Sequence, residues 1–126
     1  MKTILVDAWN TFVTESGVFQ EMKDLLDSFY NRKIIVTNAN EEEREKFGIV
    51  SMPYEVFSLE HNPNKTDPEY FQKLLEHFSL TPNEVVYFEH NTEAVASAQS
   101  VGITTFWYDK DAKDLKGLKK FLLENS

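Results

Sequence analysis

The sequence contains no cysteine, and this absence excludes disulfide bonds, cysteine-ligated zinc and thiol nucleophiles together. It suits a reducing compartment. Long apolar runs are also missing near the N-terminus, where MKTILVDAW has only three apolar residues in a row before Asp7. Such a run is too short for a signal-peptide core or a membrane span. We therefore expect a cytoplasmic protein that does not enter a membrane.

Basic residues are scarce, with 13 Lys and Arg against 21 Asp and Glu, which gives a formal net charge of -8. This balance disfavours nucleic-acid partners, because binding to a phosphate backbone usually needs a basic patch. Glycine and proline are also few, at 4 each, and 41% of the residues are hydrophobic. That composition is typical of an ordinary folded protein, and the length of 126 residues predicts a single domain over residues 1–126.

Short apolar runs of strand type alternate with segments of helical periodicity along the whole chain. The predicted strands are Thr3–Val6, Ile34–Thr37, Tyr54–Leu59, Val85–Phe88 and Ile103–Tyr108. The predicted helices are Val18–Phe29, Glu41–Phe47, a segment capped by Thr66 or Asp67 that runs to Phe78, Asn91–Val101, and a last helix in the tail after Asp111. This alternation predicts an α/β fold of the Rossmann-like, doubly wound kind, with five parallel strands and helices on both faces.

Ligands of such folds bind at the carboxyl ends of the strands. Asp7 directly follows the first strand, Thr37 and Asn38 end the second, and Lys65 lies in the loop after the third. Asp7 can be a nucleophile or metal ligand, or it can cap the following turn. The Thr37 hydroxyl, the Asn38 amide and the Lys65 ammonium group are suited to binding an anionic oxygen. The ordinary alternatives are that Thr37 and Asn38 form a turn and that Lys65 is exposed to solvent.

Three further side chains have simpler interpretations. His90 titrates near neutrality, but the three histidines lack metal-ligand spacing, so a structural or exposed role is favoured for His90. Trp9 and Trp107 are interpreted as core or pocket-wall aromatics.

The ordered set Asp7-Ala-Trp-Asn-Thr11, Ile34-Ile-Val-Thr37-Asn38, Lys65-Thr-Asp-Pro-Glu-Tyr-Phe71 and Val86-Tyr-Phe-Glu89 through Gly102 resembles the haloacid dehalogenase (HAD) superfamily of hydrolases. The resemblance implies a HAD-like sheet in which Asp7 forms a covalent intermediate. It also implies that Thr37 and Lys65 bind the transferred phosphoryl group and that Mg²⁺, held by Asp7 and Glu89, completes the site. The residues expected to contact the substrate are Trp9, Asn10, Thr11, Asn38 and Asn91.

This sequence departs from the family pattern at three positions. Phosphatases of the family have a second aspartate two residues after the nucleophile, where this chain has Trp9. In the fourth motif, His90 and Ala94 stand at positions that match acidic residues. Too few residues separate Asp7, Thr37 and Lys65 for a cap domain to be inserted between them.

Three hypotheses follow from the resemblance. The first is a capless HAD-like hydrolase, a phosphatase that attacks a phosphate ester with Asp7. The second is a catalytically degenerate HAD-like domain that binds a phosphorylated small molecule or protein without turnover. The third is a 2-haloacid dehalogenase-like hydrolase, because Asp7-Ala-Trp-Asn-Thr11 also resembles the Asp-Ala-Tyr-Gly-Thr of that branch, whose chemistry needs no metal.

Overall fold

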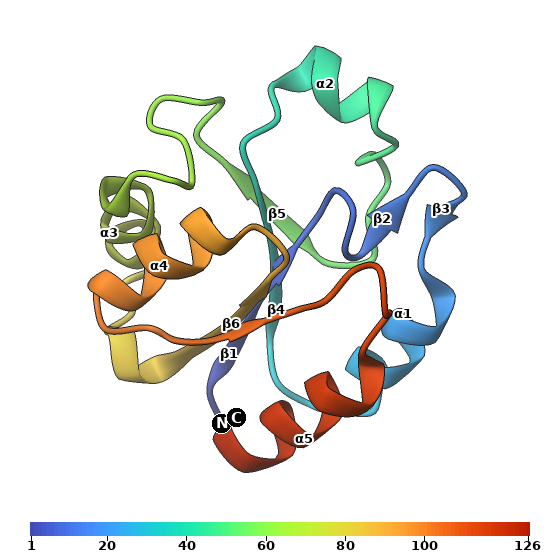
Figure 1. The fold of residues 1–126 in the computed structure, drawn as a ribbon. Coiled ribbons are helices and arrows are strands. Elements are labelled where there is room, and N and C mark those ends of the chain that lie inside the picture. The colour runs from blue at the N-terminus through green and yellow to red at the C-terminus, as the bar shows by residue number, and fades with distance from the viewer.

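A single parallel sheet of five strands forms the centre of the computed structural model, which describes residues 1–126 (Figure 1). The strands lie in the order β5-β4-β1-β6-β7. Their bounds are β1 (Thr3–Asp7), β4 (Lys33–Thr37), β5 (Glu55–Ser58), β6 (Val85–Glu89) and β7 (Thr104–Trp107). The predicted α/β class, parallel sheet and strand count are confirmed.

The three middle strands are buried along almost their full length, which explains their composition. Strand β1 pairs with β4 on one side and with β6 on the other, so both of its edges are paired. Helices cover both of its faces. A strand in that position needs apolar side chains on both faces, as in Ile34–Val36. The carboxyl ends of these three strands therefore meet at one edge of the sheet.

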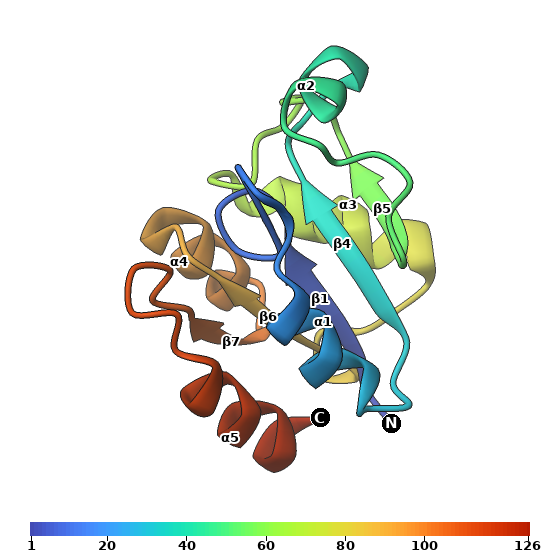
Figure 2. The ribbon, with the colours of Figure 1, turned by 90° about the vertical axis from the view of Figure 1, so that its right-hand side faces the viewer.

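Helices cover both faces of the sheet, two on each (Figure 2). On one face lie α1 (Gln20–Asp27) and α5 (Leu115–Asn125), and on the other lie α3 (Pro68–Phe78) and α4 (Thr92–Ser100). A single 3-10 turn, η1 (Pro82–Glu84), precedes β6. The arrangement leaves the strand ends, and not the sheet faces, open to a ligand.

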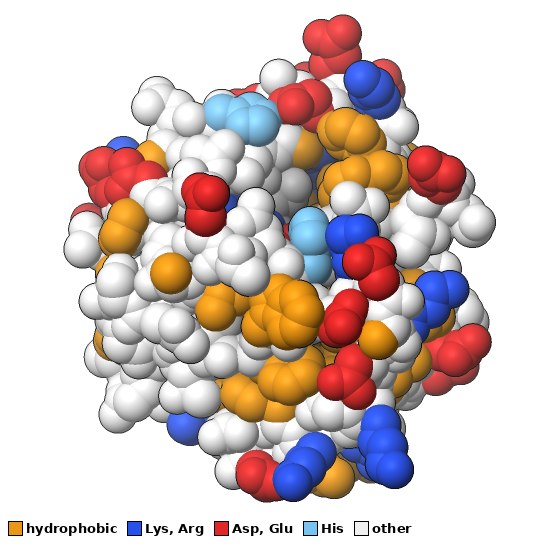
Figure 3. Space-filling view, in the orientation of Figure 1, with side chains coloured by type: hydrophobic (Ala, Val, Ile, Leu, Met, Phe, Trp, Pro, Cys, Tyr) orange, Lys and Arg blue, Asp and Glu red, His pale blue; other side chains and the backbone are white.

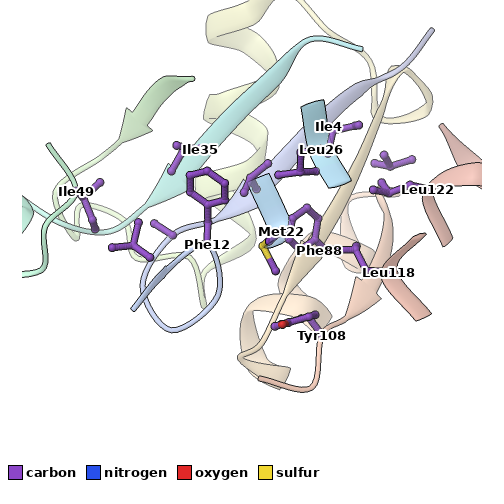
Figure 4. Packing of buried hydrophobic residues seen from close by; sticks show 14 of the residues in the cluster. Ile4, Phe12, Met22, Leu26, Ile35, Ile49, Phe88, Tyr108, Leu118 and Leu122 are labelled. Atoms are coloured by element: carbon purple, nitrogen blue, oxygen red, sulfur yellow. The ribbon is translucent and has the colours of Figure 1, made fainter. Parts of the chain in front are cut away.

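The core under α1 and α5 is built from aliphatic and aromatic side chains of both helices and the sheet (Figure 4). Met22 and Leu26 come from α1, and Leu118 and Leu122 come from α5. Phe88 of β6 lies among them. These side chains recur at the helical spacing that the sequence predicted, which is why each helix has one buried stripe.

The core under α3 and α4 is the more aromatic of the two. Tyr70 and Phe71 of α3 pack with Tyr87 of β6, and the Phe71 and Tyr87 ring centroids lie 5.2 Å apart. The Tyr70 hydroxyl donates to the carbonyl of Thr37 at 2.9 Å, at the end of β4. This buried bond ties α3 to the strand end that carries Thr37.

A short hairpin was not predicted from the sequence. Strands β2 (Val13–Thr14) and β3 (Gly17–Val18) pair antiparallel within the stretch after Asp7 that was expected to be a polar loop. Gly17 has a φ of 99°, a conformation that costs a glycine little. The hairpin returns the chain from the end of β1 to the start of α1.

Helix α2 (Glu41–Lys46) lies beyond the carboxyl ends of the strands, at the top of Figure 1. It begins with a capping box, in which the Asn40 side chain accepts from the Glu43 amide and the Glu43 carboxylate accepts from the Asn40 amide. Phe47, at its end, faces Trp9, with ring centroids 4.6 Å apart. The helix thus places one wall beside the loop that follows Asp7.

The two chain ends meet at the opposite edge of the sheet, where the Lys2 amide donates to the Ser126 carbonyl at 3.2 Å. No cap domain is inserted between the strands. None of the helices has both the length and the apolar character that crossing a membrane requires.

Candidate active site

The Asp7 carboxylate is buried at the end of β1 and accepts hydrogen bonds on both oxygens. Its Oδ1 accepts from Lys65 Nζ at 2.7 Å. Its Oδ2 accepts from the Thr11 hydroxyl at 2.6 Å and lies 2.5 Å from His90 Nδ1. Although burial alone would raise the pKa of Asp7, these charged and hydrogen-bonding neighbours hold it well below its usual value. Asp7 is therefore ionised at neutral pH.

Lys65 is the counter-ion of two carboxylates at once. Its Nζ donates to Asp7 Oδ1 at 2.7 Å, to Glu89 Oε1 at 2.8 Å and to the Val36 carbonyl at 3.3 Å. Burial would lower the pKa of Lys65, but the two carboxylates outweigh it and raise that pKa above its ordinary value. All three ammonium hydrogens have acceptors within the chain, so Lys65 fixes the relative positions of Asp7 and Glu89.

Glu89 ends β6 and is as deeply buried as Asp7. Its Oε1 accepts from Lys65 and from the Tyr87 hydroxyl, and its Oε2 accepts from the Asn91 amide at 3.0 Å. Burial and the nearby carboxylates raise the pKa of Tyr87, which keeps its hydroxyl protonated as a donor. The Glu89 carboxylate is thus saturated by donors from its own chain.

His90 was interpreted from the sequence as a structural or exposed residue, but it lines the cavity and contacts both carboxylates. Its Nδ1 lies 2.5 Å from Asp7 Oδ2 and 3.2 Å from Glu89 Oε2, and its carbonyl accepts from Trp107 Nε1 at 2.8 Å. Burial would lower its pKa, but the hydrogen bonds to the two carboxylates outweigh that effect and raise the pKa of His90 to about 9. The signal in the sequence was its place beside Glu89 at a strand end.

A cavity of about 190 Å³ opens over these four side chains (Figure 3). Asp7, Lys65, Glu89 and His90 form its floor. One wall is apolar and the rim is polar. The wall residues are Trp9, Phe47, Ile49, Ala39 and Ala94, and the rim residues are Glu43, His61, Asn64, Thr66 and Asn91.

Thr37 and Asn38 both line this cavity, but their side chains make different hydrogen bonds. The Thr37 oxygen accepts from the Ala39 amide at 3.2 Å, which leaves its hydroxyl hydrogen free to donate. The Asn38 side chain is hydrogen-bonded to the neighbouring loop, because its Oδ1 accepts from the Lys65 amide at 2.7 Å and its Nδ2 donates to Asn64 at 3.0 Å. Asn38 thereby positions Lys65.

Of the other residues that were expected to contact substrate, some line the cavity and some do not. Trp9 and Asn91 line the cavity, and Asn91 also caps α4 by accepting from the Glu93 amide at 2.9 Å. Thr11 lies beneath Asp7 and is fully covered. Asn10 is exposed away from the cavity, with a φ of 68° in the turn toward the hairpin. Asn10 and Thr11 are therefore not part of the cavity surface.

Solved structures of the same fold include several HAD proteins. A HAD family enzyme from Bacteroides thetaiotaomicron, crystallised as an aspartate-to-alanine mutant with magnesium and inorganic phosphate, superposes with a TM-score of 0.75 at 12% identity, covering 94% of this chain and 98% of the other. The core domain of a proposed phosphoglycolate phosphatase from Streptococcus pneumoniae superposes with a TM-score of 0.64 at 18% sequence identity, covering 100% of this chain and 98% of the other. A proposed beta-phosphoglucomutase from Thermotoga maritima superposes with a TM-score of 0.52 at 23% sequence identity, covering 70% of this chain and 44% of the other.

The family profile of haloacid dehalogenase-like hydrolases matches residues 1–108. The chain therefore belongs to the haloacid dehalogenase-like hydrolase family, as a capless member. No curated protein sequence matches it. The family resemblance seen in the sequence is confirmed.

The Bacteroides thetaiotaomicron enzyme is crystallised with magnesium. One atom each of Asp7, Glu89 and His90 falls within 4.8 Å of the others. However, all four carboxylate oxygens already accept from N–H or O–H donors of the chain. Mg²⁺ requires closely spaced oxygen ligands in near-ideal octahedral geometry. In this arrangement the residues do not fit Mg²⁺, because the ion would have to displace Lys65 or His90.

Proposed function

We propose that this protein hydrolyses phosphate monoesters, with Asp7 as the nucleophile. The observation that carries the proposal is an ionised carboxylate on the floor of a cavity at the carboxyl end of the central strand. Of its two oxygens, Oδ1 accepts only from Lys65, whereas Oδ2 has several donors. Oδ1 therefore retains a lone pair for attack on phosphorus.

Donors for the phosphoryl oxygens surround the same floor. The Thr37 hydroxyl is free to donate, and the backbone N–H groups of Trp9 and Asn38 have no acceptor within the chain. Both amides follow strand ends, where backbone N–H groups suit an anion. Asn91 Nδ2, at the start of α4, is also without an acceptor in the chain. Together these groups can stabilise the charge of a transferred phosphoryl group.

A proton donor for the leaving group is needed because Trp9 stands where family phosphatases have an acid. We assign that role to His90, whose Nε2 has no hydrogen-bond partner in the chain and which lines the cavity. As Asp7 Oδ1 bonds to phosphorus, the ester P–O bond breaks and its electron pair, with a proton from Nε2, leaves on the alcohol. Water then attacks the aspartyl phosphate, His90 takes back a proton, and phosphate and the Asp7 carboxylate are released.

The cavity also limits the substrate. About 190 Å³ is enough for a phosphoryl group with a small organic part, and the Trp9, Phe47 and Ile49 wall favours an apolar or aromatic one. The Glu43 carboxylate accepts from His61 Nε2 at 2.7 Å on the rim, and this pair restricts the entrance. A phosphorylated small molecule is therefore the proposed substrate, and a phosphorylated side chain of a protein is the alternative that an open, capless site allows.

The direct test is hydrolysis of 4-nitrophenyl phosphate by the purified protein. Asp7→Asn should lower kcat by roughly a thousandfold or more, since the amide cannot form the covalent intermediate. Asp111→Asn, at an exposed position that does not line the cavity, is the matched control and should leave the rate unchanged. No turnover across a panel of phosphate esters would overturn the proposal.

One observation favours a second function, binding of a phosphorylated ligand without turnover. Asp7 is only 2% exposed, and both of its oxygens are already hydrogen-bonded. In that case inorganic phosphate should raise the melting temperature of the wild type while every ester stays intact. Trp9→Asp combined with Ala94→Asp should then create a phosphatase activity that the parent lacks.

The cavity does not support the dehalogenase hypothesis, because Ala94 offers no carboxylate there to activate water.

A further inference from the structure

Two buried carboxylates and two nitrogen bases of this chain form a closed cluster on the cavity floor. Lys65 Nζ donates to both carboxylates, at 2.7 Å from Asp7 Oδ1 and 2.8 Å from Glu89 Oε1. On the other side, His90 Nδ1 lies 2.5 Å from Asp7 Oδ2 and 3.2 Å from Glu89 Oε2. Each carboxylate is therefore bracketed by the same pair of nitrogen groups.

His90 Nδ1 faces one oxygen of each carboxylate, at 2.5 Å from Asp7 Oδ2 and 3.2 Å from Glu89 Oε2. A metal ion shared by these two oxygens would have to displace the imidazole ring. This matters because His90 stands in the sequence where the family pattern has an acidic residue.

The cluster provides a partner for every carboxylate oxygen without an added ion, because each of the four oxygens has an N–H or O–H donor of the chain beside it. Asp7, Glu89 and Lys65 are less than a tenth exposed, so a charge left without a partner here would be costly. A divalent cation added to this set would lie beside the Lys65 ammonium and would compete with an N–H or O–H donor of the chain for every carboxylate oxygen.

We propose that Lys65 and His90 together take the place of the divalent cation at the Asp7 site, so that the site is complete without Mg²⁺. His90 is the determining residue, because it converts a position of metal ligation into one of hydrogen-bond donation. The inference concerns metal binding alone and holds whether or not the protein turns over a substrate.

The test is a titration with Mn²⁺, a paramagnetic substitute for Mg²⁺, followed by electron paramagnetic resonance of the free ion. Wild-type protein should leave the free-ion signal unchanged at millimolar Mn²⁺. His90→Asp removes the donor and adds a carboxylate beside Asp7 and Glu89, so it should bind one equivalent. His61→Asp makes the same change on the cavity rim, 2.7 Å from Glu43 and away from the floor, and should bind none.

Stoichiometric Mn²⁺ binding by the wild type, lost in Asp7→Asn, would overturn the proposal. So would a folded His90→Asp protein that binds no more Mn²⁺ than the wild type. If His90→Asp does not fold, the melting temperature of the wild type decides. It should be the same in a chelator and in excess Mg²⁺, and a drop in the chelator would contradict the proposal.

Discussion

Lys65 Nζ and Asp7 Oδ1 form a buried ion pair at 2.7 Å between residues 58 positions apart in the sequence. Asn38 helps to make this pair, since its side chain accepts from the Lys65 amide and holds the loop against the end of β4. The pair therefore depends on three separate strand ends. Its position explains why the carboxylate can be both buried and ionised.

Removing the cation should strongly destabilise the fold. Lys65→Met leaves Asp7 and Glu89 buried without their shared counter-ion, and breaking a buried pair in this way costs about 3–5 kcal/mol. Lys73→Met is the matched control, because Lys73 Nζ lies 3.6 Å from Glu69 in an exposed pair worth no more than about 0.5 kcal/mol. Urea unfolding of both variants measures the difference. Equal losses would contradict the assignment of Lys65 as the counter-ion.

The free energy of unfolding should fall as the pH rises through the alkaline range. His90 has a pKa of about 9 in the folded protein against an ordinary value of 6.5, so its protonated form stabilises the fold. That contribution is complete below about pH 6.5 and is lost by about pH 9, and it amounts to roughly 3 kcal/mol. Urea unfolding at a series of pH values in this window measures the slope.

His90→Gln is the control for this pH dependence, because glutamine does not titrate. The variant should lose most of the slope between pH 6.5 and pH 9. At the acid end the opposite sign applies to Asp7, whose lowered pKa stabilises the fold above its unfolded value of 3.8, so stability falls as the pH drops below that value. An identical alkaline slope in the wild type and His90→Gln would refute the assignment to His90.

The core beneath α5 allows a test with two adjacent leucines. Leu122 is fully buried among side chains of β1, β6 and α1, so Leu122→Ala should cost about 3 kcal/mol of unfolding free energy (Figure 4). Leu123 is 66% exposed, and Leu123→Ala should change stability by no more than about 0.5 kcal/mol. Thermal or urea unfolding compares them. Similar costs for both would mean that α5 is rotated from the position described.

The apolar wall should determine which phosphate esters bind well. Phe47→Ala removes half of the Trp9 and Phe47 pair, and the KM for 4-nitrophenyl phosphate should rise roughly three- to tenfold with little change in kcat. Methyl phosphate, which has no aromatic group to contact the wall, should keep its KM. A parallel rise for both esters would show that Phe47 supports the fold of the floor and not substrate binding.

Much of the fold was predictable because the signals are local. The apolar runs of β1, β4 and β6 and the helical spacing of Leu118 and Leu122 specify buried elements without knowledge of their partners. The hairpin of β2 and β3 escaped prediction because each strand has two residues, too few to establish an alternation. Its pairing depends on the turn at Gly17.

The sequence predicts which strand ends contribute residues to the site, but it does not predict the contacts that these residues make. Asp7, Thr37, Lys65 and Glu89 meet because parallel strands bring their carboxyl ends together. The role of His90 depends on contacts with Asp7 and Trp107 that no spacing in the sequence encodes. Asn10 was misplaced because its left-handed backbone directs the turn toward the hairpin, which a reading of motif positions does not reveal.

Direct trapping of the intermediate tests whether Asp7 attacks the phosphorus of a phosphate ester. The protein is mixed with an excess of 4-nitrophenyl phosphate, quenched in acid and digested for mass spectrometry. We expect one phosphoryl group on the peptide that contains Asp7, and none in Asp7→Asn. Undiminished turnover in Asp7→Asn, or a phosphoryl group on another residue in the wild type, would contradict it.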